Sequence, residues 1–164
     1  MRKIITSAIL ISLFNVTAAE ASLAITSPSS VCVVLNNVGL STGSWENFSD
    51  SEFGCNSPYK EIGSGFPLAN NLAYYVDGKR NSVTQAKLVL NVNNKSQATS
   101  AHFALLNASE ALSIKIAGVK LPQTIKDAIT EGKPMKTKVG QTAVEVKRDN
   151  WPTGKGYELH VILK

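Results

Sequence analysis

The chain has 164 residues, of which 43% are hydrophobic, 18% charged and 7% aromatic, and its formal net charge is +5. This length fits a single domain, and the hydrophobic share excludes a disordered chain. The net charge is far below that of a dedicated nucleic-acid binder, so we expect no nucleic-acid partner. Nothing in the composition reveals an activity.

The N-terminal segment has the order of a secretory signal peptide. Two basic residues at the start precede the apolar run 4–14, and a group of small residues follows. A membrane-spanning helix needs about 20 apolar residues, so the shorter run favours a cleaved signal peptide over a retained anchor. We predict that residues 1–21 are removed, with Ala19 as the alternative cleavage position. Residues 22–164 are then expected to form a single periplasmic or secreted domain without a membrane span.

Both cysteines, Cys32 and Cys55, lie in the predicted mature region. An exported chain meets an oxidising compartment, where an even number of cysteines favours pairing. We therefore predict a structural Cys32–Cys55 disulfide. The cysteines and the two distant histidines, His102 and His160, lack the close spacing of zinc ligands, so we expect no metal and no cofactor. Both histidines are expected at the surface, His160 on the outward side of the last strand.

The first part of the predicted domain combines a helix with a long irregular segment. Residues 27–39 have helical apolar spacing between a Ser-Pro start and a terminal glycine. Residues 41–70 are rich in Gly, Ser, Asn and Pro and are expected to be mainly loops, with one short strand near 52–56. Aromatic residues in such a loop either pin it to the core or form a ligand surface. The candidates are Trp45, Tyr59 and Phe66.

The rest of the chain is predicted to alternate between strands and helices. Residues 71–76 and 83–92 are expected to form two strands joined at an Asp77-Gly78 turn. Helices are predicted over 100–117 and 122–132. The C-terminal third has three segments of period-two alternation, 135–139, 142–146 and 157–164.

This order of elements predicts an α+β domain. We expect a twisted, largely antiparallel sheet of about five strands. An N-terminal helix and a central helix pair are expected to pack on one of its faces.

The loop before the last strand is the strongest candidate for an interaction surface. Lys147, Arg148, Trp151 and Lys155 lie in or beside it, and Trp and Arg are enriched at interaction hot spots. Trp151 also precedes a proline and is suited to stacking on a sugar ring or base. The alternative is that Trp151 folds back on the sheet.

The sequence has no HExxH motif and no calcium-binding loop of regularly spaced acids. Glu46, Asp50 and Glu52 cluster in the irregular segment, where paired carboxylates could act as acid and base. Solvated loop charges are the alternative. We assign no catalytic residue.

The charges are unevenly distributed along the chain. Residues 22–74 contain four acidic groups and one basic group, whereas residues 75–164 contain 14 basic and 7 acidic groups. This asymmetry could create a basic face for an anionic partner. Solvated lysines on an ordinary surface are the alternative.

Two parts of the sequence carry a resemblance to known proteins, namely 39–45 with 55–75, and 144–159. They resemble an uncharacterised family of small exported proteins of Gram-negative bacteria. This resemblance implies a periplasmic location and transfers no catalytic residue. Separately, the order of helices and strands resembles that of type III secretion chaperones, which are usually cytosolic and acidic. That likeness is one of topology and implies no function.

The leading interpretation is an exported, non-enzymatic module that binds a protein partner as an accessory, inhibitor or immunity factor. One alternative is a binder of an anionic envelope polymer or small ligand. The other is a small hydrolase that uses the loop carboxylates.

Overall fold

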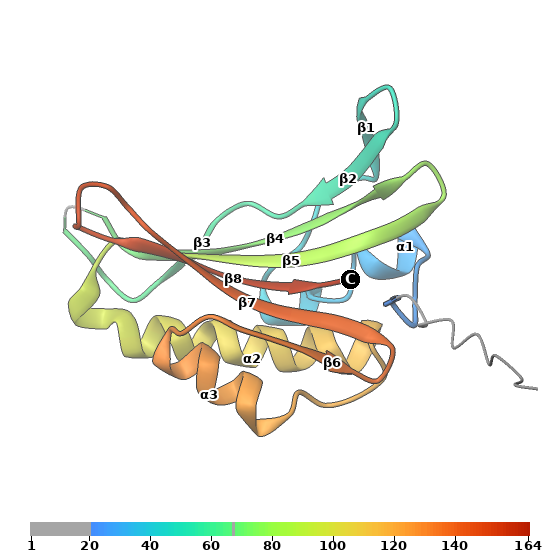
Figure 1. The fold of residues 1–164 in the computed structure, drawn as a ribbon. Helices are drawn as coiled ribbons and strands as arrows, with labels where there is room; N and C mark the ends of the chain where they lie inside the picture. The colour runs from blue at the N-terminus through green and yellow to red at the C-terminus, as the bar shows by residue number, and fades with distance from the viewer. Residues whose placement is uncertain (1–20, 67) are drawn as a thin grey trace, which may run out of the picture.

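Eight strands form one antiparallel sheet in a computed structural model that describes residues 21–66 and 68–164 (Figure 1). Apart from Ala21, the predicted signal peptide lies outside the described residues. The strands are β1 (Glu46–Ser49), β2 (Glu52–Asn56), β3 (Lys60–Ile62), β4 (Asn70–Lys79), β5 (Ser82–Val92), β6 (Met135–Val139), β7 (Thr142–Asn150) and β8 (Tyr157–Leu163). Their order across the sheet is β1-β2-β4-β5-β8-β7-β6, and β3 also pairs with β4.

In the residues that the structure describes, the sheet is accompanied by three α-helices, α1 (Pro28–Val31), α2 (Ala98–Ile116) and α3 (Gln123–Glu131). They accompany two short 3₁₀ segments, Asn36–Val38 and Lys95–Gln97. Figure 1 shows α2 and α3 below the sheet, with the other side of the sheet facing away from them. The prediction of an α+β domain with an antiparallel sheet is confirmed. No helix in the described part of the chain combines the length and apolarity needed to cross a membrane.

The expected number of about five strands is wrong, because the segment 41–70 contributes strands at the edge of the sheet. β2 lies where one short strand was predicted, while β1 and β3 have no counterpart in the prediction. β4 is ten residues long, so β2 pairs with its second half and β3 with its first half. Strands of three or four residues are too short to show a period of two.

Alternating side chains of the long strands form the core with the helices. The inward side chains of β4 are Leu72, Tyr74 and Val76, and all three are buried. The fully buried Tyr74 donates its hydroxyl hydrogen to the carbonyl oxygen of Val31 at 3.0 Å, so it links β4 to α1. Burial raises the pKa of Tyr74 well above its ordinary value, and the phenol therefore stays neutral.

The first helix is much shorter than predicted. α1 ends at Val31, and the chain continues through turns to a 3₁₀ segment that Gly39 closes with a φ of +77°. Four valines lie within residues 31–38, and β-branched side chains disfavour an α-helix. Only the start and the end of the predicted helix are therefore found where expected.

The predicted Asp77-Gly78 turn is also wrong. β4 continues through Lys79, and the turn lies at residues 80–81. The pairing register shifts at Gly78, where a Cβ atom would lie 2.2 Å from the carbonyl oxygen of Ser82. The glycine therefore permits a close approach of two strands within the hairpin instead of forming its tip.

His102 is buried, contrary to the expectation that it lies at the surface. Its Nδ1 lies 2.9 Å from the carbonyl oxygen of Thr130, and its Nε2 lies 2.8 Å from the hydroxyl oxygen of Tyr157. The prediction considered one apolar stripe on α2. The helix buries a second row because it packs against both the sheet and the α3 region, and this row includes His102, Ser109 and Ser113.

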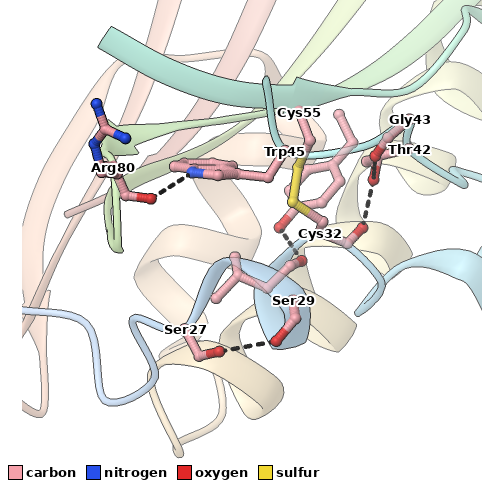
Figure 2. The surroundings of a disulfide bond; sticks show 10 residues. Ser27, Ser29, Cys32, Thr42, Gly43, Trp45, Cys55 and Arg80 are labelled. Atoms are coloured by element: carbon pink, nitrogen blue, oxygen red, sulfur yellow. Dashed lines mark hydrogen bonds between the residues drawn. A yellow bond between two sulfur atoms is a disulfide. The ribbon is translucent and has the colours of Figure 1, made fainter. Parts of the chain in front are cut away.

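The Cys32–Cys55 disulfide is present, as predicted, with 6.1 Å between the two Cα atoms. It connects the end of α1 to β2, and both cysteines are buried (Figure 2). Thr42 donates a hydrogen bond to the carbonyl oxygen of Cys32 at 3.0 Å, so the intervening segment is held at a second point. The bridge therefore anchors the irregular segment to the sheet.

Replacing both cysteines by alanine should lower the free energy of unfolding by about 3 kcal/mol, because the unfolded chain regains the freedom of a loop with a sequence separation of 23 residues. Denaturant unfolding of the wild type and the double variant measures this loss. A reductant should destabilise the wild type alone. Equal stability of the two oxidised proteins would contradict the anchoring role.

Candidate functional site

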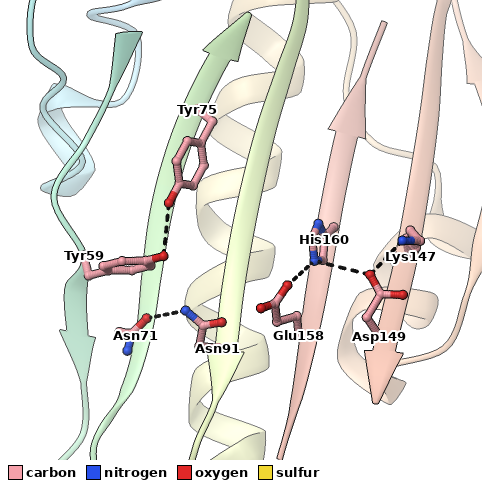
Figure 3. A network of polar contacts seen from close by, with 8 residues as sticks. All are labelled: Tyr59, Asn71, Tyr75, Asn91, Lys147, Asp149, Glu158 and His160. Atoms are coloured by element: carbon pink, nitrogen blue, oxygen red, sulfur yellow. Dashed lines mark hydrogen bonds and ion pairs between the residues drawn. The ribbon is translucent and has the colours of Figure 1, made fainter. Parts of the chain in front are cut away.

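The face of the sheet opposite the helices carries three rows of side chains across β4, β5, β8 and β7. Directly paired residues of an antiparallel sheet lie on the same face, so the register defines each row. The rows are Asn71–Asn91–Glu158–Asp149, Ala73–Val89–His160–Lys147 and Tyr75–Lys87–Ile162–Glu145. We call this surface the open face. Figure 3 looks onto it, with α2 behind the strands.

A histidine and two carboxylates meet at the β7–β8 side of the open face. The Nε2 atom of His160 lies 2.8 Å from Glu158 Oε2 and 3.7 Å from Asp149 Oδ2 (Figure 3). Lys147 contacts the same Asp149 oxygen at 2.7 Å. This contact lowers the pKa of Asp149 and raises that of Lys147, so each group favours the charged form of the other.

His160 lies on the outward side of β8, as its place in the alternation predicted. Its side chain is nevertheless only 13% exposed. The neighbouring strands cover the His160 side chain, because it is paired between Val89 and Lys147 in the middle row. The expectation of an exposed histidine is therefore wrong.

Two tyrosines and two amides occupy the β4–β5 side of the open face. The Tyr75 hydroxyl donates to the Tyr59 hydroxyl at 3.2 Å, and the Lys87 Nζ atom lies 5.2 Å from the centre of the Tyr75 ring. Asn91 donates to the side-chain oxygen of Asn71 at 2.8 Å (Figure 3). Burial, aided by the bond to Tyr59, raises the pKa of Tyr75. The phenol is therefore a neutral hydrogen-bonding group.

A hollow of about 560 Å³ lies at one end of the open face. The β1–β2 hairpin, which rises beside β4 in Figure 1, forms one wall. Phe48 and Phe53 line it from this hairpin, and Asp77 and Gln85 line it from the β4–β5 hairpin. Gln85 donates to Asp77 at 3.0 Å. The open face therefore ends in a partly apolar depression.

A second hollow of about 560 Å³ lies beside the disulfide, where Cys32, Val33 and Trp45 contribute to its lining. The Trp45 indole nitrogen donates to the carbonyl oxygen of Arg80 at 3.0 Å (Figure 2). Its ring stacks on Phe53, with 6.5 Å between ring centres. Trp45 therefore pins the irregular segment to the sheet while one side of the ring faces the hollow.

The three candidate aromatic residues of the irregular segment occupy different places. Trp45 lies beside the disulfide, and Tyr59 joins the open face with 57% of its surface exposed. Phe66 is 98% exposed in the connection before β4. They do not form a common surface.

The sheet also separates the four candidate residues of the last loop. Lys147 lies on the open face, whereas Arg148 points to the helices, because successive residues of a strand face opposite ways. The Trp151 ring lies against Gly156, where a Cβ atom would come within 2.4 Å of it. Lys155 is exposed in the tip of the loop.

Arg148 makes contacts that are structural. Its Nη1 donates to the carbonyl oxygen of Gly132 at the end of α3 at 3.1 Å. Its guanidinium carbon lies 3.6 Å from the centre of the Tyr157 ring. These contacts join β7, β8 and α3.

The candidate carboxylates Glu46, Asp50 and Glu52 are all exposed on the β1–β2 hairpin. Among the residues that the structure describes, one group of three acidic, histidine or cysteine side chains brings its ligand atoms within 4.8 Å of one another. This group is Asp149, Glu158 and His160. The carboxylates singled out from the sequence are therefore not the ones that converge.

The basic residues of the C-terminal part are spread over both faces. Lys126 and Lys133 pair with acids of the helices, and Lys136 and Lys147 pair with acids of β7. On the open face, charges of both signs occur, since Lys87 and Lys147 lie among Glu145, Asp149 and Glu158.

Sequence reasoning missed Asp149 because the predicted strand ended at residue 146. β7 instead continues to Asn150, and the backbone N–H of Trp151 donates to the carbonyl oxygen of Gly156 to close the hairpin. The alternation of side chains along β8 placed Glu158 and His160 on the same side of the sheet. The register that places Asp149 opposite Glu158 has no local signal in the sequence.

The chain matches no family model, no curated protein and no solved structure.

The neighbouring residues Arg148 and Lys147 provide a matched pair for mutation. Arg148→Met should lower the free energy of unfolding by about 1–3 kcal/mol, because it removes the bond to Gly132 and the stacking on Tyr157. Lys147→Met should leave stability nearly unchanged, since its ion pair is exposed. Thermal and denaturant unfolding measure both effects. Equal losses in the two variants would contradict the assignment of opposite faces.

Proposed function

We propose that the protein is an exported, non-enzymatic module whose open face binds a protein partner. The observation that carries this proposal is the open face itself, a sheet surface of ordered polar and aromatic side chains opposite the helices (Figure 3). An accessory protein, an inhibitor and an immunity factor all act by such binding.

Export is supported by three independent features. The N-terminal segment has the order of a signal peptide. The Cys32–Cys55 disulfide suits an oxidising compartment. The resemblance to small exported proteins of Gram-negative bacteria points the same way.

The dimensions of the open face fit a small protein interface. Its rows cross four strands, and β8 is seven residues long. At about 4.8 Å between strands and about 3.3 Å per residue, such a patch presents roughly 440 Å². This is about half of the roughly 800 Å² that each partner buries in a standard protein–protein interface, and it lies in the range of transient complexes. The hollow beside Phe48 could receive an anchoring side chain at one end.

The charges of the open face favour a protein over an anionic polymer. Lys147 is paired with Asp149, and Lys136 is paired with Glu145. A polyanion requires an excess of positive charge along a surface, whereas a surface with charges of both signs suits a folded partner with complementary charges. Binding should therefore depend only moderately on salt. A steep loss of binding between low and high salt would favour the polymer.

A pair of matched double variants tests the proposal. Tyr59→Ala with Lys87→Ala removes an exposed aromatic ring and a lysine from the open face. Phe103→Ala with Lys115→Ala likewise removes an exposed aromatic ring and a lysine, here from the exposed side of α2. Affinity capture from a periplasmic extract, followed by quantitative mass spectrometry, compares both with the wild type.

The wild type and the α2 variant should retain the same partner, and the open-face variant should retain at least about tenfold less, as expected when hot-spot contacts are lost. Unchanged capture by the open-face variant, or an equal loss in both variants, would contradict the proposal. Circular dichroism verifies that both variants are folded.

A further inference from the structure

We propose that Asp149, Glu158 and His160 form a binding site for a divalent transition-metal ion, with Zn²⁺ as the best-suited ion. The site does not depend on the proposed partner, because the three side chains belong to this chain alone. Metal binding would remain if the open face bound no protein.

The positions of the three ligand atoms fit a zinc ion. Ligands of a tetrahedral zinc ion lie about 2.0–2.2 Å from the metal, and therefore about 3.3 Å from one another. His160 Nε2 lies 2.8 Å from the Glu158 oxygen and 3.7 Å from the Asp149 oxygen, on either side of that value. Shifts of about half an ångström would bring these two separations to the tetrahedral value, and all three ligand atoms lie within 4.8 Å of one another.

The backbone holds these ligands on a rigid support. Glu158 and His160 are two residues apart on β8, so both point to the open face. Asp149 is paired directly with Glu158 across the β7–β8 ladder. Sites built on strands hold their geometry better than sites on loops. The local register therefore brings the three groups together without any rearrangement of the chain.

The chemistry and exposure of the group favour a transition metal. One imidazole nitrogen with two carboxylate oxygens suits Zn²⁺, whereas Mg²⁺ and Ca²⁺ prefer oxygen ligands alone. The side chains of His160, Glu158 and Asp149 are 13%, 36% and 44% exposed. The ion can therefore reach the site from solvent, and a fourth coordination position would face outward to water or to a partner.

Lys147 competes with the ion for Asp149. Its Nζ atom lies 2.7 Å from the Asp149 oxygen, and its side chain is half exposed. It can turn into solvent when a cation binds, but its positive charge opposes that cation. We therefore expect that removing Lys147 strengthens metal binding.

Calorimetric titration of Zn²⁺ into the untagged, disulfide-bonded protein, after treatment with a chelator, tests the proposal. The wild type should bind one ion per chain. His160→Gln and Asp149→Asn should each weaken binding at least about tenfold, whereas Lys147→Met should strengthen it several-fold. Glu145→Gln is the control, since this acid lies on the same face but pairs with Lys136, and it should leave the affinity within about twofold of the wild type.

Nuclear magnetic resonance of the imidazole rings provides a second readout. The chain has two histidines, and Zn²⁺ should shift the ring signals of His160 while leaving those of the buried His102 unchanged. The absence of zinc binding in both the wild type and Lys147→Met would overturn the proposal. Zinc binding that persists in His160→Gln, or that leaves the His160 signals unshifted, would also overturn it.

Discussion

The pairing register of β4, β5, β8 and β7 is the constraint on which the rest of the structure depends. Because side chains alternate along a strand, a single register decides which residues meet the helices and which remain on the open face. A slip of one residue in β8 would turn His160 toward the core and bring Val161 to the surface. The packing of the apolar core therefore fixes the composition of the open face.

Several local features hold this register in place. Gly78 allows the strands of the β4–β5 hairpin to approach at the shift in their pairing. The bond from Trp151 to Gly156 closes the β7–β8 hairpin. At the other edge, the Cys32–Cys55 disulfide ties α1 to β2, and Tyr74 bonds to the end of α1. These contacts therefore restrain the two hairpins that join the long strands, and they hold α1 against β2 and β4.

Much of the fold could be predicted from periodicity. The central helices and β8 have repeated apolar spacing over many residues, and the disulfide followed from two cysteines in a predicted exported domain. β1 and β3 are too short to produce such a pattern. His102 was misplaced because α2 buries two rows of residues, and the second row becomes apparent only when α3 is in place.

The candidate site could be predicted only in part. Alternation along β8 put Glu158 and His160 on one side, but their neighbour Asp149 comes from another strand. Tyr59 and Tyr75 likewise meet through pairing that involves β2, β3 and β4. Such neighbours depend on register and hairpin length, which are set by the whole sheet. The local sequence therefore indicated which residue types point outward, but it did not indicate which of them lie next to one another on the open face.

Oxidative footprinting of the native complex recovered from the periplasm is the most direct test of the central claim that the open face binds the partner. Tyr59 and Tyr75 should react in the free protein and become protected in the complex. The buried Tyr74, Tyr157 and His102 should stay unreactive in both states. Protection confined to Phe103 and the exposed side of α2, with the open face still reactive, would contradict the account.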